Sequence, residues 1–260
     1  MRLLGNEPYE ALRRAESVAL SDPIGALPLA AAAEQALAGT HHEDVVGRLA
    51  LLRARAHTVR GEHFPALAQI RLAHREWIAE GHPERGTLAQ LAAHEPFLAL
   101  SEFDMVVDSA RRIFSEMASA DLGPDGDQQL ISWHAEAHLA IGRAFDGKGE
   151  TRPAMRHFDV AANLFQVLGD PTGVAQTHAA RGHTLLTLNM AHRAVEELLA
   201  AYKHFHSARL ELPAHRTLVH LGRALLSQGR VSAAISLLQR TRIQLVLLGA
   251  RGDVAESSWR

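Results

Sequence analysis

The sequence predicts an all-α protein built from about six antiparallel helix pairs that stack one after another. One observation is a small residue that returns at a step of 40 residues, with a single step of 48, at Ala26, Ala66, Val106, Ala154, Ala194 and Ala234. A second is that apolar residues follow the helical period of about 3.6 and nowhere alternate over the length of a strand. A third is that glycine and proline fall between these stretches, where helices end. Self-similarity at such a step is typical of a stacked-repeat protein.

Each period has room for two helices of roughly 15–18 residues and two short turns. In chain order we expect the repeats at about 7–41, 42–81, 82–121, 127–169, 170–209 and 210–249. A seventh repeat begins at 250–260, where Val254-Ala255-Glu256 matches Val174-Ala175-Gln176. We therefore expect one repeat domain over 1–260 that is a fragment of a longer protein.

Within each repeat, single residues predict where the helices and the turns lie. The clearest buried stripe runs over 154–168 at the spacing of a single helix face: Ala154, Phe158, Ala161, Ala162, Phe165 and Leu168. The turn inside each pair is predicted at one repeat position: Ser21, Gly61, Ser101, Gly149, Asn189 and Gly229. The 48-residue step carries its extra length at 120–127, where we expect a longer loop.

Composition excludes several classes of protein. The formal charge of −2 gives no general argument for nucleic acid or an anionic membrane as partner. The absence of cysteine excludes disulfides, thiolate zinc sites and cysteine nucleophiles, and it fits a reducing compartment. We find neither a signal peptide nor an apolar run long enough to cross a bilayer, so we expect a cytoplasmic protein.

The repeat pattern resembles the tetratricopeptide repeat (TPR). That family places small residues, a bulky residue and a turn residue at fixed positions, and the fourth repeat matches them with Gly142, Phe145, Gly149, Ala154, Phe158 and Ala161. The steric reason is that small residues let neighbouring helices approach closely while a large residue fills the gap beside them. The resemblance implies a right-handed superhelical solenoid. The step of 40, longer than the usual one, is similar to lengthened variants in bacterial regulatory and signalling proteins.

The resemblance also implies a binding groove, because the first helix of each TPR pair lines the concave face. Carried over position by position, it predicts a mostly basic groove lined by Arg48, Arg55, Glu95, Glu136, Arg143, His183, Arg216 and Arg223. Arginines at intervals of one repeat suit charge-assisted binding of the carboxylates of an acidic peptide. The alternative is that these are ordinary exposed arginines of helices. The asparagine and lysine that clamp a C-terminal carboxylate in some TPR proteins are missing here.

The 17 histidines raise the question of a metal site. His134 and His138 lie four residues apart on a predicted helix, so both rings could face one ion. However, Glu136 is not at the offset of the zinc-protease motif, and the sequence offers no obvious third ligand. Packing histidines and pH-responsive histidines are the alternatives. The motifs of serine hydrolases, phosphate loops and dinucleotide-binding folds are absent from the sequence.

These observations favour a non-catalytic scaffold without cofactors. The leading hypothesis is a protein- or peptide-binding TPR module, the sensory or docking part of a cytoplasmic bacterial regulator. The second is a dimerisation module that pairs through an exposed apolar face around Ile235, Leu238 and Leu245. The third is a metal-dependent hydrolase that uses His134 and His138. A nucleic-acid partner is expected only through a further domain outside this sequence.

Overall fold

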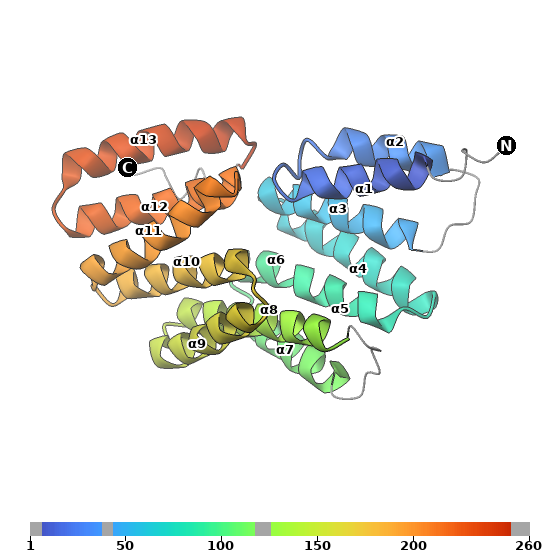
Figure 1. The fold of residues 1–260 in the computed structure, drawn as a ribbon, viewed down its shortest axis with the longest axis horizontal. Helices are drawn as coiled ribbons and strands as arrows, with labels where there is room; N and C mark the ends of the chain where they lie inside the picture. The colour runs from blue at the N-terminus through green and yellow to red at the C-terminus, as the bar shows by residue number, and fades with distance from the viewer. Residues whose placement is uncertain (1–6, 38–43, 118–125, 251–260) are drawn as a thin grey trace.

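All the regular secondary structure that the computed structural model describes, in residues 7–37, 44–117 and 126–250, is α-helical. Successive helices pack as antiparallel pairs (Figure 1). In chain order the pairs are α1 (Glu7–Ala19) and α2 (Leu27–Leu37); α3 (Val45–Val59) and α4 (His63–Ala79); α5 (Pro83–Ala92) and α6 (His94–Ala99), which together pair with α7 (Phe103–Met117); α8 (Gly126–Gly147) and α9 (Thr151–Val167); α10 (Pro171–Thr187) and α11 (Ala191–Ser207); and α12 (Glu211–Ser227) and α13 (Val231–Leu247). The predicted all-α fold of stacked helix pairs is confirmed.

The close approach of paired helices depends on small residues, as the sequence pattern predicts. A Cβ atom placed on Gly142 would lie 2.5 Å from Phe158 Cε1, and one placed on Gly182 would lie 2.6 Å from Leu198 Cγ. The third contact of this kind, between Gly222 and Leu238, is also 2.6 Å. Because real Cβ atoms do not come so close to another carbon, glycine at this repeat position sets the distance between the helices.

The turn inside each pair uses a left-handed backbone conformation at the predicted position. The backbone φ is +76° at Gly61, +60° at Ser101, +77° at Gly149, +60° at Asn189 and +75° at Gly229. Glycine adopts this conformation without a steric penalty, and asparagine tolerates it. The first pair differs, since Ser21 has no positive φ. There, Asp22 Oδ1 accepts a hydrogen bond of 2.8 Å from the backbone nitrogen of Gly25.

The first helix of the third pair is broken into α5 and α6. Pro96 lies close to the break, and a proline inside a helix has no N–H to donate and clashes with the carbonyl four residues earlier, here that of Ala92. The helix therefore ends at Ala92 and restarts at His94, while the Phe97 backbone nitrogen donates to the Ala93 carbonyl at 3.1 Å. Glu95, which is central to the site described below, lies in the first turn of α6.

The array curls until its two ends touch (Figure 1). Ile24, in the turn between α1 and α2, packs in one hydrophobic cluster with Val59 of α3 and with residues of α12 and α13. A Cβ atom on Gly249 would lie only 2.6 Å from Ile24 Cδ1. Part of the sixth pair is therefore covered by the chain's own N-terminal half.

This closure corrects part of the predicted dimerisation face. Leu238 and Leu245 are only 4% and 0% exposed, because both belong to the cluster that Ile24 and Val59 join. Ile235, in contrast, is 48% exposed. Of the three residues expected to form an open apolar face, only Ile235 reaches the surface. The predicted start of a seventh repeat lies outside the described residues except for Ala250, as does most of the predicted loop at 120–127.

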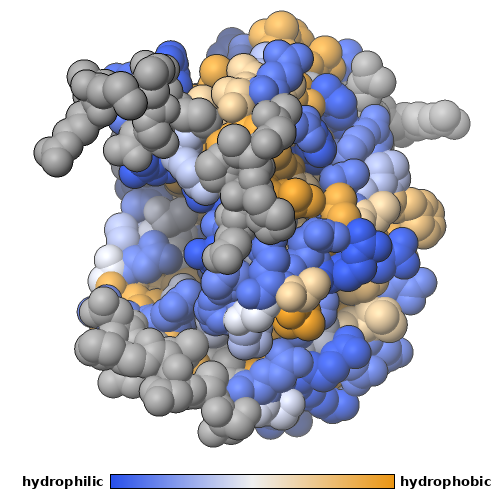
Figure 2. Space-filling model, turned by 90° about the vertical axis from the view of Figure 1, so that its right-hand side faces the viewer, coloured by the Kyte–Doolittle hydropathy of each residue, from blue (hydrophilic) through white to orange (hydrophobic). Residues whose placement is uncertain are grey.

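The surface beside the N-terminal helices is predominantly hydrophilic, with hydrophobic side chains in separate small groups (Figure 2). None of the helices that the structure describes is long and apolar enough to cross a membrane.

Candidate functional site

The curl brings charged side chains from the first helices of four successive pairs to its inner side. We call this group the central charged cluster; it consists of Glu95 on α6, Arg143 and Asp146 on α8, His183 on α10, and Arg216, His220 and Arg223 on α12. Residues far apart in the sequence meet here because the pairs stack side by side. Five of these seven residues were predicted for the groove from the sequence, and the other two, Asp146 and His220, were not.

Glu95 is the common partner of two arginines. Arg143 Nη1 lies 2.7 Å from Glu95 Oε2, and Arg216 Nη1 lies 3.5 Å from Glu95 Oε1. The charge of Arg143, with a further contribution from Arg216, holds the pKa of Glu95 at about 2 against the opposing effect of burial. The three side chains remain 33–44% exposed, so solvent and ligands can reach them.

The histidines of the cluster lie on its other side. His183 Nδ1 is 2.7 Å from Asp146 Oδ2, and the His183 ring meets the His220 ring edge-on at a centroid distance of 4.9 Å. Burial, helped by the nearby His183 and Arg223, lowers the pKa of His220 to about 3, so this ring is neutral at physiological pH. Its Nδ1 is buried and makes no hydrogen bond within the described part of the chain.

The cluster has an excess of positive charge. Three guanidinium groups (Arg143, Arg216 and Arg223) face the two carboxylates of Glu95 and Asp146, so three minus two leaves one positive charge even with every histidine neutral. Among the described residues, the side chain of Arg223 makes no ion pair. Excess guanidinium groups in a partly enclosed site favour a carboxylate or another oxyanion as ligand.

The other predicted groove residues have other partners. The Arg48 guanidinium group donates two hydrogen bonds, of 2.6 and 2.7 Å, to the Glu16 carboxylate and so links α3 to α1. These hydrogen bonds raise the pKa of Arg48. Burial raises the pKa of Glu136. The charge of Arg55 partly offsets this rise, whereas Asp170 raises the pKa further. Arg55 and Glu136 form a second charged group on α3 and α8. Arg48, Arg55 and Glu136 therefore have partners other than those of the central charged cluster, and their place in a binding groove stays a prediction.

The proposed metal ligands His134 and His138 take part in an aromatic cluster. The Phe114 ring lies 5.1 Å from each of the two histidine rings, and His138 Nδ1 lies 2.9 Å from Nδ1 of His157 on α9. Burial, with the neighbouring His157 and His134, lowers the pKa of His138 to about 4. In residues 7–37, 44–117 and 126–250, no group of three or more histidines and acidic residues is placed to hold a metal ion.

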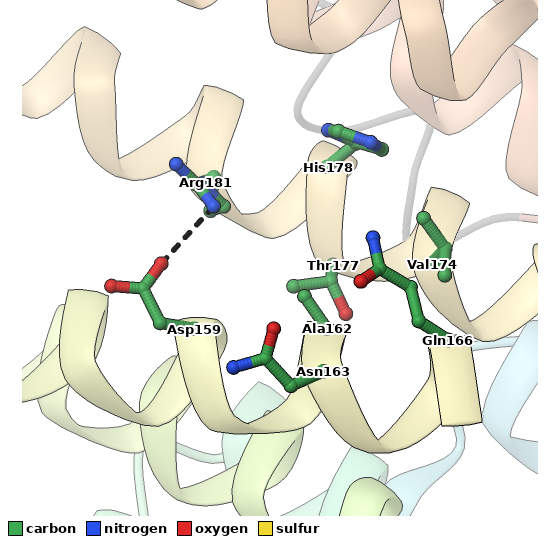
Figure 3. Close-up of a pocket in the computed structure, with 8 residues that line it drawn as sticks. All are labelled: Asp159, Ala162, Asn163, Gln166, Val174, Thr177, His178 and Arg181. Atoms are coloured by element: carbon green, nitrogen blue, oxygen red, sulfur yellow. Dashed lines mark hydrogen bonds and ion pairs between the residues drawn. The ribbon is translucent and has the colours of Figure 1, made fainter. Parts of the chain in front are cut away.

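A second site, which the sequence did not suggest, lies on the opposite side of α10 from His183. Two adjoining pockets of about 310 and 530 Å³ run between α9, α10 and α11. We call them together the α9–α11 crevice; the first is lined by Asp159, Ala162, Asn163, Gln166, Val174, Thr177, His178 and Arg181 (Figure 3). No catalytic motif marks these residues. Comparing equivalent positions of successive repeats could have found them.

No family model and no curated protein sequence matches the chain. Among solved structures, the fold is similar to that of a Rap protein complexed with competence and sporulation factor, with a TM-score of 0.65 and 14% identity over 97% of this chain and 73% of that chain. The fold is that of a TPR-like helical repeat protein. The fold is also similar to that of BtubC from P. vanneervenii, with a TM-score of 0.52 and 16% identity over 95% of this chain and 93% of that chain. It is similar as well to the apo form of RapI, with a TM-score of 0.52 and 12% identity over 92% of this chain and 74% of that chain.

Proposed function

We propose that this protein is a non-catalytic, TPR-like binding module of a cytoplasmic bacterial regulator, and that its central charged cluster holds an acidic group of a protein or peptide. The observation that carries the proposal is the convergence of Arg143, Arg216 and Arg223 on the inner side of the curl, with one guanidinium group in excess over the two carboxylates. A peptide carboxylate would pair with that excess charge by charge-assisted hydrogen bonds. That the similar Rap protein was solved in complex with a factor supports a peptide or protein as partner.

The groups of the cluster suit recognition rather than chemistry. Its one buried, unpaired nitrogen belongs to His220, whose pKa of about 3 makes it a poor base at neutral pH. Of its two carboxylates, Glu95, with a pKa of about 2, stays ionised and cannot donate a proton. Fixed charges of this kind position a ligand, and the extended inner side of a helical repeat array presents them over several residues.

The test uses two labelled probe peptides, hexaglutamate and hexaglutamine, whose binding is measured by fluorescence anisotropy. We expect hexaglutamate to bind and hexaglutamine to bind far more weakly, and we expect the affinity for hexaglutamate to fall with added salt. The informative variant is Arg223→Glu, because this side chain makes no ion pair among the described residues, so its loss leaves no internal acid unpaired. We expect it to weaken binding about tenfold or more, which corresponds to about 1.4 kcal/mol.

The matched control is Arg240→Glu, which makes the same charge change at an exposed position of α13. Binding to this variant should resemble that of the unchanged protein. Equal loss in the two variants would assign the effect to net charge alone, and failure of hexaglutamate to bind at low salt would reject the proposal.

A further inference from the structure

The α9–α11 crevice differs in chemistry from the equivalent places in the two neighbouring repeats. The crevice is lined by polar side chains, among them Asn163, Gln166, His178 and Arg181, and the last two contact Glu197 of α11. One repeat later, forty residues on, these positions hold Lys203, His206, Leu218, Leu221 and Leu237. One repeat earlier, the position of His178 holds His138, and Phe114 packs on its ring. The middle one of these three places is polar, and the two described pockets lie there.

Ion pairs fix one part of the crevice. Arg181 Nη1 lies 3.1 Å from Asp159 Oδ1, as Figure 3 shows, and Arg181 Nε lies 3.4 Å from Glu197 Oε1. His178 Nδ1 lies 2.5 Å from the other oxygen of Glu197. Burial alone would raise the pKa of Glu197, but the hydrogen bond with His178 and the charge of Arg181 lower it, so this carboxylate is ionised. Arg181 faces two carboxylates, and each of these groups already has an internal partner, so none of them is left over to pair with a charged ligand.

The hydrogen-bonding capacity that remains lies along α9. Asn163 and Gln166 point from α9 toward α10 in Figure 3, and within the described residues neither carboxamide makes a hydrogen bond to another side chain or to the backbone. Each carboxamide can donate and accept, so each matches the N–H and C=O groups of a peptide main chain. Being three residues apart on a helix, the two side chains are separated by about 5–6 Å, close to the two-residue repeat of an extended chain of about 6.6 Å.

The dimensions also fit a short extended segment. The lining residues of α10 run from Pro171 to Arg181, eleven residues whose ten steps along the helix span about 15 Å. An extended chain rises about 3.3 Å per residue, so four to five residues fill this length. Val174 and Ala200 give the crevice an apolar floor on which small side chains can rest.

We propose that the α9–α11 crevice is a second binding site, which takes an extended peptide segment of four to five residues without net charge. Asn163 and Gln166 bind the main chain of the segment, while Val174 and Ala200 contact its small apolar side chains. The site is separate from the central charged cluster, since His183 and Arg181, two residues apart, project from α10 about 200° apart around the helix axis. The full chain thus presents one site for an acidic group and one for neutral main chain.

The test selects from a phage library of random heptapeptides on the intact protein and then measures the affinity of each enriched peptide by isothermal titration calorimetry. The crevice variant is Asn163→Ala with Gln166→Ala, which removes both carboxamides without breaking an internal hydrogen bond among the described residues. The matched control is Lys203→Ala with His206→Ala, the equivalent positions one repeat later. The third protein is Arg223→Glu, which tests the central charged cluster.

We expect a class of uncharged, small-residue peptides whose affinity falls about tenfold or more in the crevice variant and stays unchanged in the control and in Arg223→Glu. Thermal unfolding of the crevice variant should match that of the unchanged protein, which separates lost binding from lost folding. The proposal is overturned if no uncharged peptide is enriched, if every enriched peptide binds the crevice variant normally, or if all of them depend on Arg223 instead. The last outcome would leave the proposed function of the cluster standing, whereas loss of binding in the crevice variant alone supports the second site whatever hexaglutamate does.

Discussion

The two halves of the array, α1–α7 and α8–α13, differ in how regularly they repeat the contact between paired helices. In the C-terminal half, every pair repeats one steric contact, in which Gly142, Gly182 or Gly222 lies against a large side chain of the partner helix. In the N-terminal half, the same repeat position holds Ala54 and His94, and the helix that carries His94 is broken. We call α8–α13 the regular half, because one contact between paired helices recurs in it. We call α1–α7 the irregular half, because its broken helix departs from the repeat pattern.

That departure has a consequence for the central charged cluster. His94 is buried, and its Nε2 lies 3.2 Å from Ser109 Oγ, while burial and the nearby Arg143 lower its pKa to about 4. Next to it on α6, the Glu95 side chain pairs with Arg143 and Arg216 of the regular half. The regular half thus supplies the arginines at its repeat step, and the irregular half supplies the carboxylate that partly neutralises them.

The largest effect should come from breaking the repeated contact. Gly182→Val would place two methyl groups where even a Cβ atom would lie 2.6 Å from Leu198 Cγ. We expect the substitution to lower the free energy of unfolding by about 3 kcal/mol, the upper range of overpacking. Urea unfolding monitored by circular dichroism measures this loss.

A double-mutant cycle shows whether the steric contact is the cause. In a Leu198→Ala background the space beside residue 182 is larger, so Gly182→Val should cost at least 1 kcal/mol less there than in the unchanged protein. Additive losses would mean that the glycine matters for another reason, such as the conformation of α10.

A smaller effect is expected where the two halves meet electrostatically. Glu95→Gln keeps the shape of the side chain but leaves Arg143 and Arg216 without their shared acid. We expect a loss of about 1 kcal/mol at pH 7, well below what the pKa shift alone would give, because the carboxylate is 36% exposed and solvent screens it. In the same variant hexaglutamate should bind several-fold more tightly, since the internal carboxylate no longer competes for the arginines.

The stabilisation that Glu95 contributes should depend on pH in one direction. The pKa of Glu95 falls on folding from 4.5 to about 2, so its stabilisation is present above pH 4.5 and is lost as the pH falls toward 2. Unfolding curves of Glu95→Gln should therefore lack part of the acid-induced loss that the unchanged protein shows in this window. Glu150→Gln, at an exposed position without an ion pair among the described residues, is the control. If both variants show the same pH profile, Glu95 does not couple the two halves.

The comparison also separates what the sequence could predict from what it could not. The helices and the turns at Gly61, Ser101 and Asn189 were predictable, because a steric pattern and a left-handed turn are local properties that recur at one step. The contact of Ile24 with the other end of the chain was not, since nothing local marks a side chain that meets residues more than two hundred positions away. For the same reason, Leu238 and Leu245 were expected at the surface and are buried.

The candidate sites show the same limit. Repeat positions named Glu95, Arg143 and Arg216 as neighbours in a groove, but they gave no means of finding that one acid pairs with two arginines 48 and 121 residues away. They also named Arg48, but they gave no means of finding that its guanidinium group pairs with Glu16. The charge of a residue and its position within the repeat can be read from a single repeat. Which acid pairs with which arginine depends on how far the whole array curls.

The smallest expected effect concerns a turn between two pairs of the regular half. Gly169, Arg209 and Gly249 occupy one repeat position, with φ of +64°, +56° and +70°. Only the arginine carries a Cβ atom in this left-handed conformation, which costs about 1–2 kcal/mol and is partly offset because glycine gives the unfolded chain more freedom. We therefore expect Arg209→Gly to raise the free energy of unfolding by about 0.5 kcal/mol. Gly169→Ala is the mirror experiment, because a Cβ atom there would touch nothing within 4 Å, so any loss measured by urea unfolding reports the backbone conformation alone. A stabilised Gly169→Ala, or a destabilised Arg209→Gly, would show that this turn is not held in the left-handed conformation that links one pair to the next.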